Sequence, residues 1–275
     1  MLFFVVNGVL FSTMSEMNLS KRIRNFSLGI LSFMLASLAY GIEIDKTEVG
    51  AIVKDGIVQI GSHQYPLPPG EWVLIGKNKS RVTFAYSSQQ GADILTAYLI
   101  NVKDKQFRAS VKIEATTSST ATHRWMPEPC KRDDVVFKDT MKSNYDYPEC
   151  LLINHNTNAF ASSNTWLNAV PLWLENNQIK VPVTTLLAQY DKYQTGDFVK
   201  VRFWINPELA GQTPSKNASW IKSDWHKDRL EKDTDKQIYM DKFIAWTKQL
   251  PSIYKKSLTS DDRPLAVPDF PDLAQ

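Results

Sequence analysis

A histidine at a predicted strand end is the first residue in this sequence that could do chemistry. His155 lies between two asparagines, directly after the apolar run Cys150–Ile153, which we expect to form a strand. Asp133 and Asp134 follow Cys130, so a bond between the two cysteines would bring these carboxylates toward the histidine. A histidine with a carboxylate partner is the minimum for general base catalysis near neutral pH. The sequence thus raises the hypothesis of a hydrolase. Its alternative is a turn that hydrogen-bonds its own backbone.

Tryptophan is the second residue type with a possible functional role, because the chain contains eight of them. Trp166 and Trp173 flank Pro171, while Trp220 and Trp225 lie on either side of a polar stretch, so we expect these four to be partly exposed. Exposed indole rings can stack on sugars or peptides. The four tryptophans are therefore the candidate ligand-binding residues, and the alternative is that they fill the core.

Other matches to chemical motifs are weak. The sequence contains no His-Glu-x-x-His, Gly-x-Ser-x-Gly, Gly-rich phosphate loop or Cys-x-x-Cys. Ser219–Lys222 and Ser252–Lys255 fit Ser-x-x-Lys, but the companion Ser-Asp-Asn and Lys-Thr-Gly motifs of that enzyme class are missing. Asp224, His226 and Asp228 resemble a metal cluster, yet residues two apart do not share a helix face. We interpret them as a solvated, charged helix face and predict no metal site and no cofactor.

A secretory leader is the clearest targeting signal. The basic segment Lys21–Arg24 precedes the uncharged run Phe26–Ala39, which ends among small residues. This order predicts a signal peptide region over residues 1–41, with cleavage after Ala39 or, preferably, after Gly41. The alternatives are a buried core helix or a membrane anchor, but a bilayer span needs about 20 apolar residues.

Residues 1–16 do not fit the leader, because signal peptides rarely begin this far upstream of their basic segment. We interpret Met17 as the true start of the protein. The alternative is a second apolar segment at Met1–Val6 that would form a membrane hairpin with the first.

The predicted oxidation state of the two cysteines follows from the compartment. Export would place Cys130 and Cys150 in an oxidising environment as an even pair, which predicts a disulfide between them. Closing this loop would stabilise the fold by roughly 3 kcal/mol on the chain-entropy model. No cysteine lies near the cleavage site, so the processed protein is expected to be periplasmic or secreted and not membrane-anchored.

Charge excludes one class of partner. The formal net charge is +3, and the leader carries Lys21, Arg22, Arg24 and Glu16, so the processed chain is close to neutral. This balance gives no broad basic surface, and we expect no nucleic-acid partner.

Period-two alternation predicts strands in the first half of the processed chain. It covers Val82–Tyr86 and Phe107–Ala115, and Ile94–Val102 is a β-branched and aromatic run between them. Lys103–Gln106 has the length of a hairpin connector. These segments predict an antiparallel meander with one wet face.

The second half alternates between predicted helix and strand. Apolar residues at helical spacing predict a helix over Pro182–Tyr190 that stops by Gly196. Val199–Ile205 alternates as a strand, with its odd-numbered residues on one face.

A long helix is expected at Asp224–Leu250, limited by Pro251, with Trp246 on its core face. Thr234 and Gln237 could form a capping box that splits this region into two helices.

Together these elements predict an α+β fold in which an antiparallel sheet packs against C-terminal helices, with one disulfide. The predicted organisation is a single domain over residues 42–259, followed by a Pro- and Asp-rich tail, 260–275, that is disordered or extended over the domain. The leading functional hypothesis is a non-catalytic exported protein that binds a small ligand or an envelope protein. The alternatives are the His155 hydrolase and a structural factor of the envelope.

Overall fold

The computed structural model of the protein describes residues 41–54, 56–84, 87–119, 130–143, 147–157, 169–194, 196–258 and 264–271. All of these lie in one compact unit, residues 39–275. The predicted signal peptide, apart from Gly41, lies outside the described residues.

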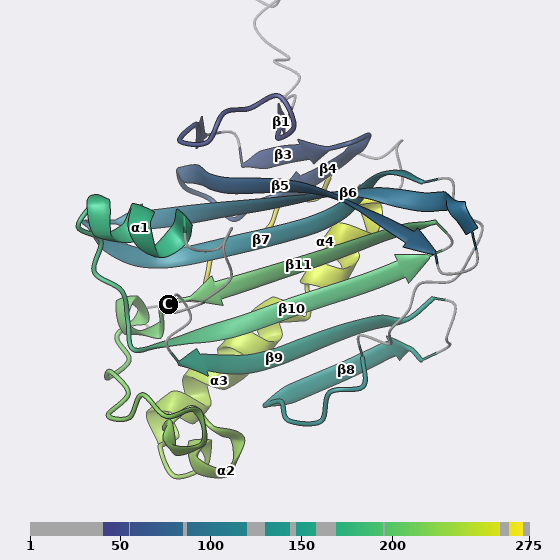
Figure 1. Cartoon of the computed structure of the whole chain (residues 1–275). Coiled ribbons are helices and arrows are strands. Elements are labelled where there is room, and N and C mark those ends of the chain that lie inside the picture. The colour runs from purple at the N-terminus through teal and green to yellow at the C-terminus, as the bar shows by residue number, and fades with distance from the viewer. Residues whose placement is uncertain are drawn as a thin grey trace, which may run out of the picture. The chain divides into compact units, whose positions relative to one another are not determined.

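The main feature of the fold is one antiparallel sheet (Figure 1). Among the described residues it has eight strands in the order β2-β5-β6-β7-β11-β10-β9-β8, and every neighbouring pair is antiparallel. In chain order the strands are β2 (Ile52–Val53), β5 (Trp72–Phe84), β6 (Ser87–Lys103), β7 (Gln106–Ser119), β8 (Phe137–Lys142), β9 (Glu149–Thr157), β10 (Thr184–Gln194) and β11 (Asp197–Ile205). The predicted meander is thus β5 to β7, and the sheet continues well beyond it.

A small second sheet consists of β1 (Ile42–Glu43), β3 (Ile57–Ile60) and β4 (His63–Pro66). β1 runs parallel to β3, and β3 pairs with β4 in antiparallel fashion. Buried residues of this sheet, including Val58, Ile60 and Tyr65, belong to the main hydrophobic core.

The helices cover both faces of the main sheet (Figure 1). They are α1 (Ala169–Asn176), α2 (Lys227–Leu230), α3 (Thr234–Thr247) and α4 (Leu250–Ser257), with short 3-10 turns at η1 (Pro207–Ala210) and η2 (Trp220–Lys222). α3 and α4 lie along one face and α1 lies on the other. The sheet and the C-terminal helices confirm the predicted α+β fold. Among the described residues, no helix combines the length and the apolar character that crossing a membrane requires.

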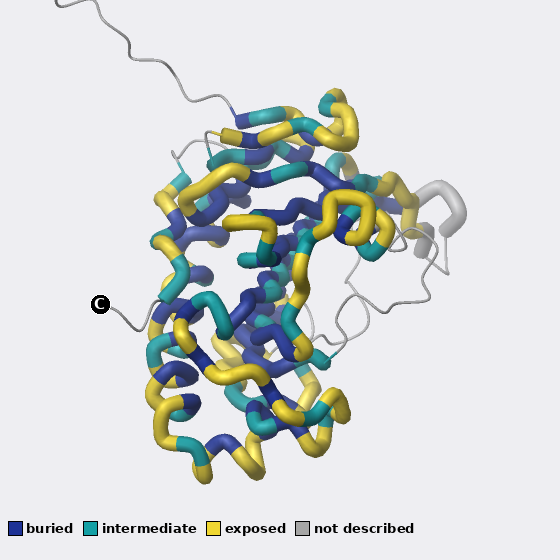
Figure 2. Tube along the Cα trace, turned by 90° about the vertical axis from the view of Figure 1, so that its left-hand side faces the viewer, coloured by how far each residue is buried: buried dark blue, intermediate teal, exposed yellow. Residues whose placement is uncertain are grey.

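The core lies between the sheet and the α3–α4 layer, where buried positions concentrate in Figure 2. The strand predicted at Val199–Ile205 is confirmed as β11, and its odd-numbered residues point into this core. Trp246 of α3 packs there against Phe203 with ring centroids 5.6 Å apart, as its helical spacing predicted. Apolar burial on this face is the main stabilising term of the fold.

The helix predicted over Pro182–Tyr190 is wrong, because Thr184–Tyr190 belong to the strand β10. Leu186, Ala188 and Tyr190 face the core, while Leu187 lies on the opposite face and is also partly buried. A strand with apolar residues on both faces can imitate helical spacing over a short run. Pairing with β9 and β11 on both sides decides the outcome.

The predicted long helix is interrupted. α2 ends by Leu230, and Asp233 begins α3 by accepting a hydrogen bond from the backbone N–H of Lys236 at 3.2 Å. The chain therefore divides where the capping-box alternative placed a helix start, but Asp233 and not Thr234 is the cap. Pro251 does not limit the helix, because it lies in the first turn of α4, where its missing N–H has no cost.

The C-terminal segment 264–271 is extended over the domain, which is one of the two outcomes expected for the tail. Trp246 Nε1 donates to the Pro268 carbonyl at 3.1 Å, and the Tyr239 hydroxyl donates to the Pro271 carbonyl at 3.3 Å. Arg108 on β7 forms an ion pair with Asp269 at 2.6 Å. The segment therefore bonds to both the helix layer and the sheet.

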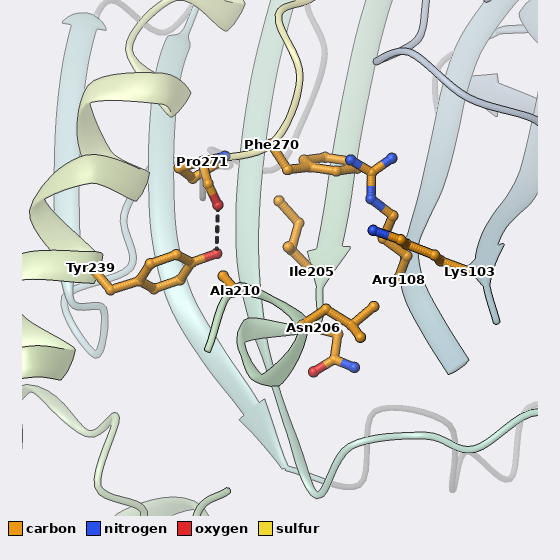
Figure 3. A pocket seen from close by; sticks show the side chains of 9 residues that line it. Lys103, Arg108, Ile205, Asn206, Ala210, Tyr239, Phe270 and Pro271 are labelled. Carbon is orange, nitrogen blue, oxygen red and sulfur yellow. Dashed lines mark hydrogen bonds between the residues drawn. The ribbon is translucent and has the colours of Figure 1, made fainter. Parts of the chain in front are cut away.

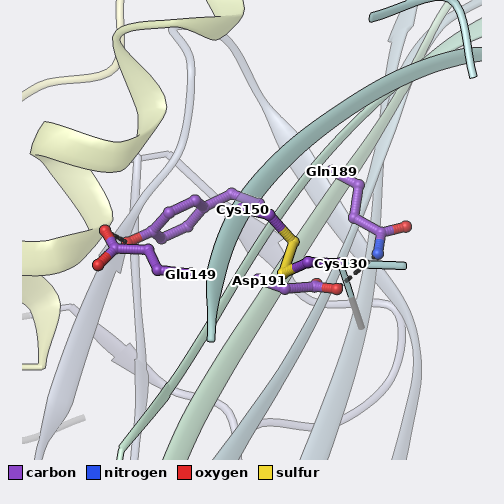
Figure 4. Close-up of a disulfide and its surroundings, with 6 residues drawn as sticks. Cys130, Glu149, Cys150, Gln189 and Asp191 are labelled. Carbon is purple, nitrogen blue, oxygen red and sulfur yellow. Dashed lines mark hydrogen bonds between the residues drawn. A yellow bond between two sulfur atoms is a disulfide. The ribbon is translucent and has the colours of Figure 1, made fainter. Parts of the chain in front are cut away.

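Two predicted local features are present. The connector between β6 and β7 is a tight hairpin turn whose central residues, Asp104 and Lys105, have φ angles of 50° and 57°. The predicted disulfide joins Cys130 to Cys150, with the two Cα atoms 5.7 Å apart (Figure 4).

Candidate functional site

The face of the sheet opposite α3 and α4 carries an ordered set of polar side chains. Three cross-strand pairs of β10 and β11 lie in consecutive rows: Leu187 opposite Trp204, Gln189 opposite Arg202, and Asp191 opposite Lys200. Successive side chains of a strand point to opposite faces, and the residues between these belong to the core. All six side chains therefore share the face that looks away from the main core.

A pocket of about 400 Å³ lies over these rows. Its lining residues are Arg132, Leu187, Gln189, Asp191, Lys200, Arg202 and Trp204. We call it the Asp191 pocket.

The disulfide brings Arg132 to the Asp191 pocket. Cys150 on β9 lies directly opposite Asp191 in register, and Cys130 is two residues before Arg132. Figure 4 shows the disulfide, Asp191 and Gln189 on the same side of the strands. The bond therefore fixes the start of the Arg132 segment beside the carboxyl group of Asp191.

Asp191 is a fully buried acid at the base of the pocket. Its Oδ2 accepts a hydrogen bond from Gln189 Nε2 at 2.7 Å, whereas Oδ1 has no partner among the described residues. Burial raises the pKa of this carboxyl group, and the positive charges of Lys200 and Arg202 only partly oppose that effect. Asp191 therefore favours its neutral form more than an exposed aspartate does.

Three cations line the same pocket as this acid. Arg202 donates from Nε to Gln189 at 3.1 Å and from Nη1 to Glu114 at 3.2 Å. The Lys200 ammonium lies over an aromatic ring, 5.5 Å from the centroid of Tyr193, and has no carboxylate partner within the described part of the chain. Lys200 is thus the cation of the pocket whose charge is least compensated.

The third cation, Arg132, is already paired. It forms two hydrogen bonds to Asp134, from Nε at 3.0 Å and from Nη2 at 2.8 Å. Both side chains are about half exposed, so this ion pair is weak and screened. Arg132 can therefore exchange its partner at little cost.

The other end of the pocket is apolar. The Trp204 ring stacks on Tyr98 with centroids 5.8 Å apart, and Leu187 lies beside it in register. The indole Nε1–H of Trp204 is buried without a hydrogen-bond partner among the described residues. The pocket thus offers a flat apolar wall next to a cationic one.

His155 is placed on the opposite face of the sheet. Its register partner Leu186 belongs to the core, and the histidine itself is buried. Its ring stacks on Trp220 with centroids 5.2 Å apart, and Nε2 bonds to the Trp220 carbonyl at 3.0 Å. Burial lowers the pKa of His155; the hydrogen bond to the Trp220 carbonyl partly opposes this effect, and the nearby His226 adds to it. The structure therefore presents a packed imidazole whose neutral form is favoured.

Asp133 and Asp134 are not brought to His155. Asp133 pairs with Lys138 and Asp134 with Arg132, and these bonds hold the pKa of each carboxyl group below its usual range. Among the described residues, no carboxylate bonds to the His155 ring. The arrangement contains no oriented acid–base pair at this histidine.

The candidate tryptophans also differ in position. Trp173 and Trp220 are partly exposed, as predicted, but Trp225 is fully buried against Tyr239, so its predicted exposure is wrong. Two short turns bend this segment and direct the ring of Trp225 inward. Trp166 lies outside the described residues.

The interpretation of Asp224, His226 and Asp228 as a solvated helix face is wrong as well. His226 is buried and precedes α2 as its N-cap, with Nδ1 accepting from the Asp228 N–H at 3.3 Å. Within the described ranges, no three His, Cys, Asp or Glu side chains are grouped as a metal site would need.

A second, much smaller cavity lies beneath the C-terminal segment (Figure 3). Its volume is about 70 Å³, and Arg108, Tyr239 and Phe270 are among its lining residues. This space suits water molecules rather than an organic ligand.

The pocket residues of β11 were visible in the sequence, whereas those of β10 were not. Alternation in Val199–Ile205 puts Lys200, Arg202 and Trp204 on one face. The face of Gln189 and Asp191 could not be predicted, because the apolar residues of their strand have helical spacing.

No protein-family model matches the sequence, and no curated protein or solved structure is significantly similar to it.

Proposed function

We propose that this chain is an exported, non-catalytic binding protein that holds a small organic anion in the Asp191 pocket. The observation that carries the proposal is the cationic wall of Lys200, Arg202 and Arg132 beside the exposed part of Trp204. An anion can accept charge-assisted hydrogen bonds from the three cations, and a flat apolar group can pack against the Trp204 ring.

The size of the pocket supports a small ligand. A volume of about 400 Å³ lies near the lower end of the range for small-molecule sites, which runs from about 300 to 1,000 Å³. A single ring with an acidic substituent fits this space. The pocket lies on the sheet face away from α3 and α4, not between sheet and helices, so its recognition surface differs from the aromatic groove expected from the sequence.

Export rests on the leader and the disulfide. The basic, apolar and small-residue order of the leader supports translocation, and a bonded cysteine pair supports an oxidising compartment. We expect N-terminal sequencing of the native protein to give a start at Ile42 or Tyr40. We also expect that protein to contain no free thiol. A retained leader together with two free thiols would overturn this part of the proposal.

Binding is tested with three probes of one size: benzoate, benzylamine and benzyl alcohol. In ¹⁵N-labelled protein, we expect benzoate to shift the indole N–H signal of Trp204, identified by its loss in Trp204→Phe. The neutral probe should bind more weakly and the cationic one weakest. Lys200→Gln should weaken benzoate binding about tenfold, because it removes one charge-assisted contact.

Arg81→Gln is the matched control, since Arg81 is an exposed, ion-paired cation on β5 of the same sheet and lies outside the pocket. Its benzoate affinity should equal that of the unmodified protein. Equal binding of benzylamine and benzoate, or no response of Trp204 to any of the three probes, would contradict the proposal.

A further inference from the structure

We propose that the Asp191 pocket binds its anion together with one proton, which is taken up by Asp191. This inference rests on the proposed function and deepens it, because it defines the bound state as an ionised ligand beside a neutral carboxylic acid. The proton comes from solvent and adds to the carboxylate of Asp191, and no other bond forms or breaks.

The geometry of the carboxyl group assigns the proton to one oxygen. Oδ2 already accepts from Gln189 Nε2 at 2.7 Å, so it behaves as the carbonyl oxygen of an acid. Oδ1 is buried without a hydrogen-bond partner among the described residues. An ionised Oδ1 in that position would lack both solvent and a donor, which is costly. A protonated Oδ1 avoids this cost.

The charges that face Asp191 leave it sensitive to a ligand. On β11 they are Lys200 and Arg202, and on β7 they are Glu114 and Lys112, which pair with each other at 3.1 Å. From β9 comes only the disulfide sulfur of Cys150, which does not titrate. The segment after Cys130 adds Arg132, which is paired with Asp134.

Binding of an anion favours the protonated form of Asp191. Lys200 and Arg202 are the two charges that stabilise ionised Asp191, and a bound anion would engage both of them. Its own negative charge would lie in the same pocket as the carboxyl group and would disfavour ionisation further. Binding and protonation are therefore linked, so affinity should fall as the pH rises, by at most about tenfold per pH unit for one proton.

Asparagine reproduces the neutral acid at this position. In Asp191→Asn, the amide oxygen can accept from Gln189 Nε2, and the NH₂ group takes the place of the O–H donor. The variant should therefore bind the anion at every pH with the affinity that the unmodified protein reaches in acid. Asp139→Asn is the control, because Asp139 is an exposed aspartate on β8.

The experiment uses benzenesulfonate, which stays ionised between about pH 5 and pH 8, so that only the protein can titrate. Calorimetric titrations in buffers of different ionisation enthalpy measure the protons taken up on binding. We expect uptake of a fraction of a proton in the unmodified protein and in Asp139→Asn, largest at the pH where Asp191 is ionised in the free protein and protonated in the complex, and no uptake in Asp191→Asn. The affinity of Asp191→Asn should not depend on pH.

The possible failures are distinguishable. Benzenesulfonate binding without proton uptake, or the same pH dependence in Asp191→Asn as in the unmodified protein, would overturn this inference alone. Absence of binding by benzenesulfonate and benzoate at every pH would overturn the proposed function with it. Loss of binding in a folded Asp191→Asn would show that an ionised carboxylate is needed, and this also overturns the inference.

Discussion

Replacing Phe270 with alanine tests whether the C-terminal segment stabilises the whole domain. The Phe270 ring lies 5.4 Å from Trp246 and 6.3 Å from both Trp72 and Phe203, measured between ring centroids. The Arg108 guanidinium lies 5.1 Å from the same ring (Figure 3). One side chain thus bridges the helix layer and the sheet.

The expected loss follows from these contacts. Truncating a fully buried phenylalanine costs about 3–5 kcal/mol, and Phe270 is only partly buried. Each aromatic pair contributes about 0.5–1.5 kcal/mol beyond its buried area, and the cation–π contact about 0.5–1 kcal/mol. We therefore expect Phe270→Ala to lower the free energy of unfolding by about 2–3 kcal/mol, which corresponds to roughly 4–12 °C in Tm.

Urea unfolding followed by far-UV circular dichroism measures this loss without relying on the tryptophans that the substitution touches. Leu265→Ala is the matched control, because Leu265 belongs to the same segment but is 41% exposed. It should change stability by less than about 0.5 kcal/mol. A loss below about 1 kcal/mol for Phe270→Ala, or equal losses for the two variants, would refute the bridging role.

Three further substitutions have defined outcomes. Replacing both Cys130 and Cys150 with alanine should lower the free energy of unfolding by roughly 3 kcal/mol and abolish the destabilising effect of a reductant in urea titrations; a reductant that still destabilises the variant would contradict this. Lys105→Gly should raise stability by about 0.5 kcal/mol, because glycine tolerates the φ of 57° at this hairpin turn, and an unchanged urea midpoint would count against it. The lowered pKa of His155 means that the unfolded chain binds this proton more readily, so stability should fall as pH drops through about 6.5. His155→Phe should flatten that slope in urea titrations across this range, and a slope that the substitution leaves unchanged would contradict the assignment.

Most of the architecture could be predicted where one physical signal dominates. In β7 and β11 the residues alternate because one face of each strand is buried and the other is polar, so the strands could be predicted from that alternation. The disulfide could be predicted because the chain has only two cysteines. The exception is β10, because its residues are buried on both faces and its apolar residues therefore lose the period of two.

The candidate site could be predicted only in part, because it depends on which strands become neighbours. Lys200, Arg202 and Trp204 share a face by local alternation alone. That this face meets Asp191 follows from the β10–β11 register, and that Asp191 is buried follows from tertiary packing. The hypothesis of a catalytic His155 has the same weakness. Its position near a strand end can be predicted from the sequence, but the face on which it lies is set by the pairing of β9 with β10.

The strand order has a consequence for how the chain folds. β5 to β7 pair with their chain neighbours, and so do β8 to β11, so each group is a meander of mostly local contacts. The two groups meet at a single boundary, where Val199 lies opposite Ala115 and Ile205 opposite Ala109. Contacts between segments this far apart in sequence form against the greatest loop-closure entropy. We therefore expect the pairing of β7 with β11 to be the slow step of sheet assembly. The strand β11, which supplies Lys200, Arg202 and Trp204 to the Asp191 pocket, lies on one side of this boundary.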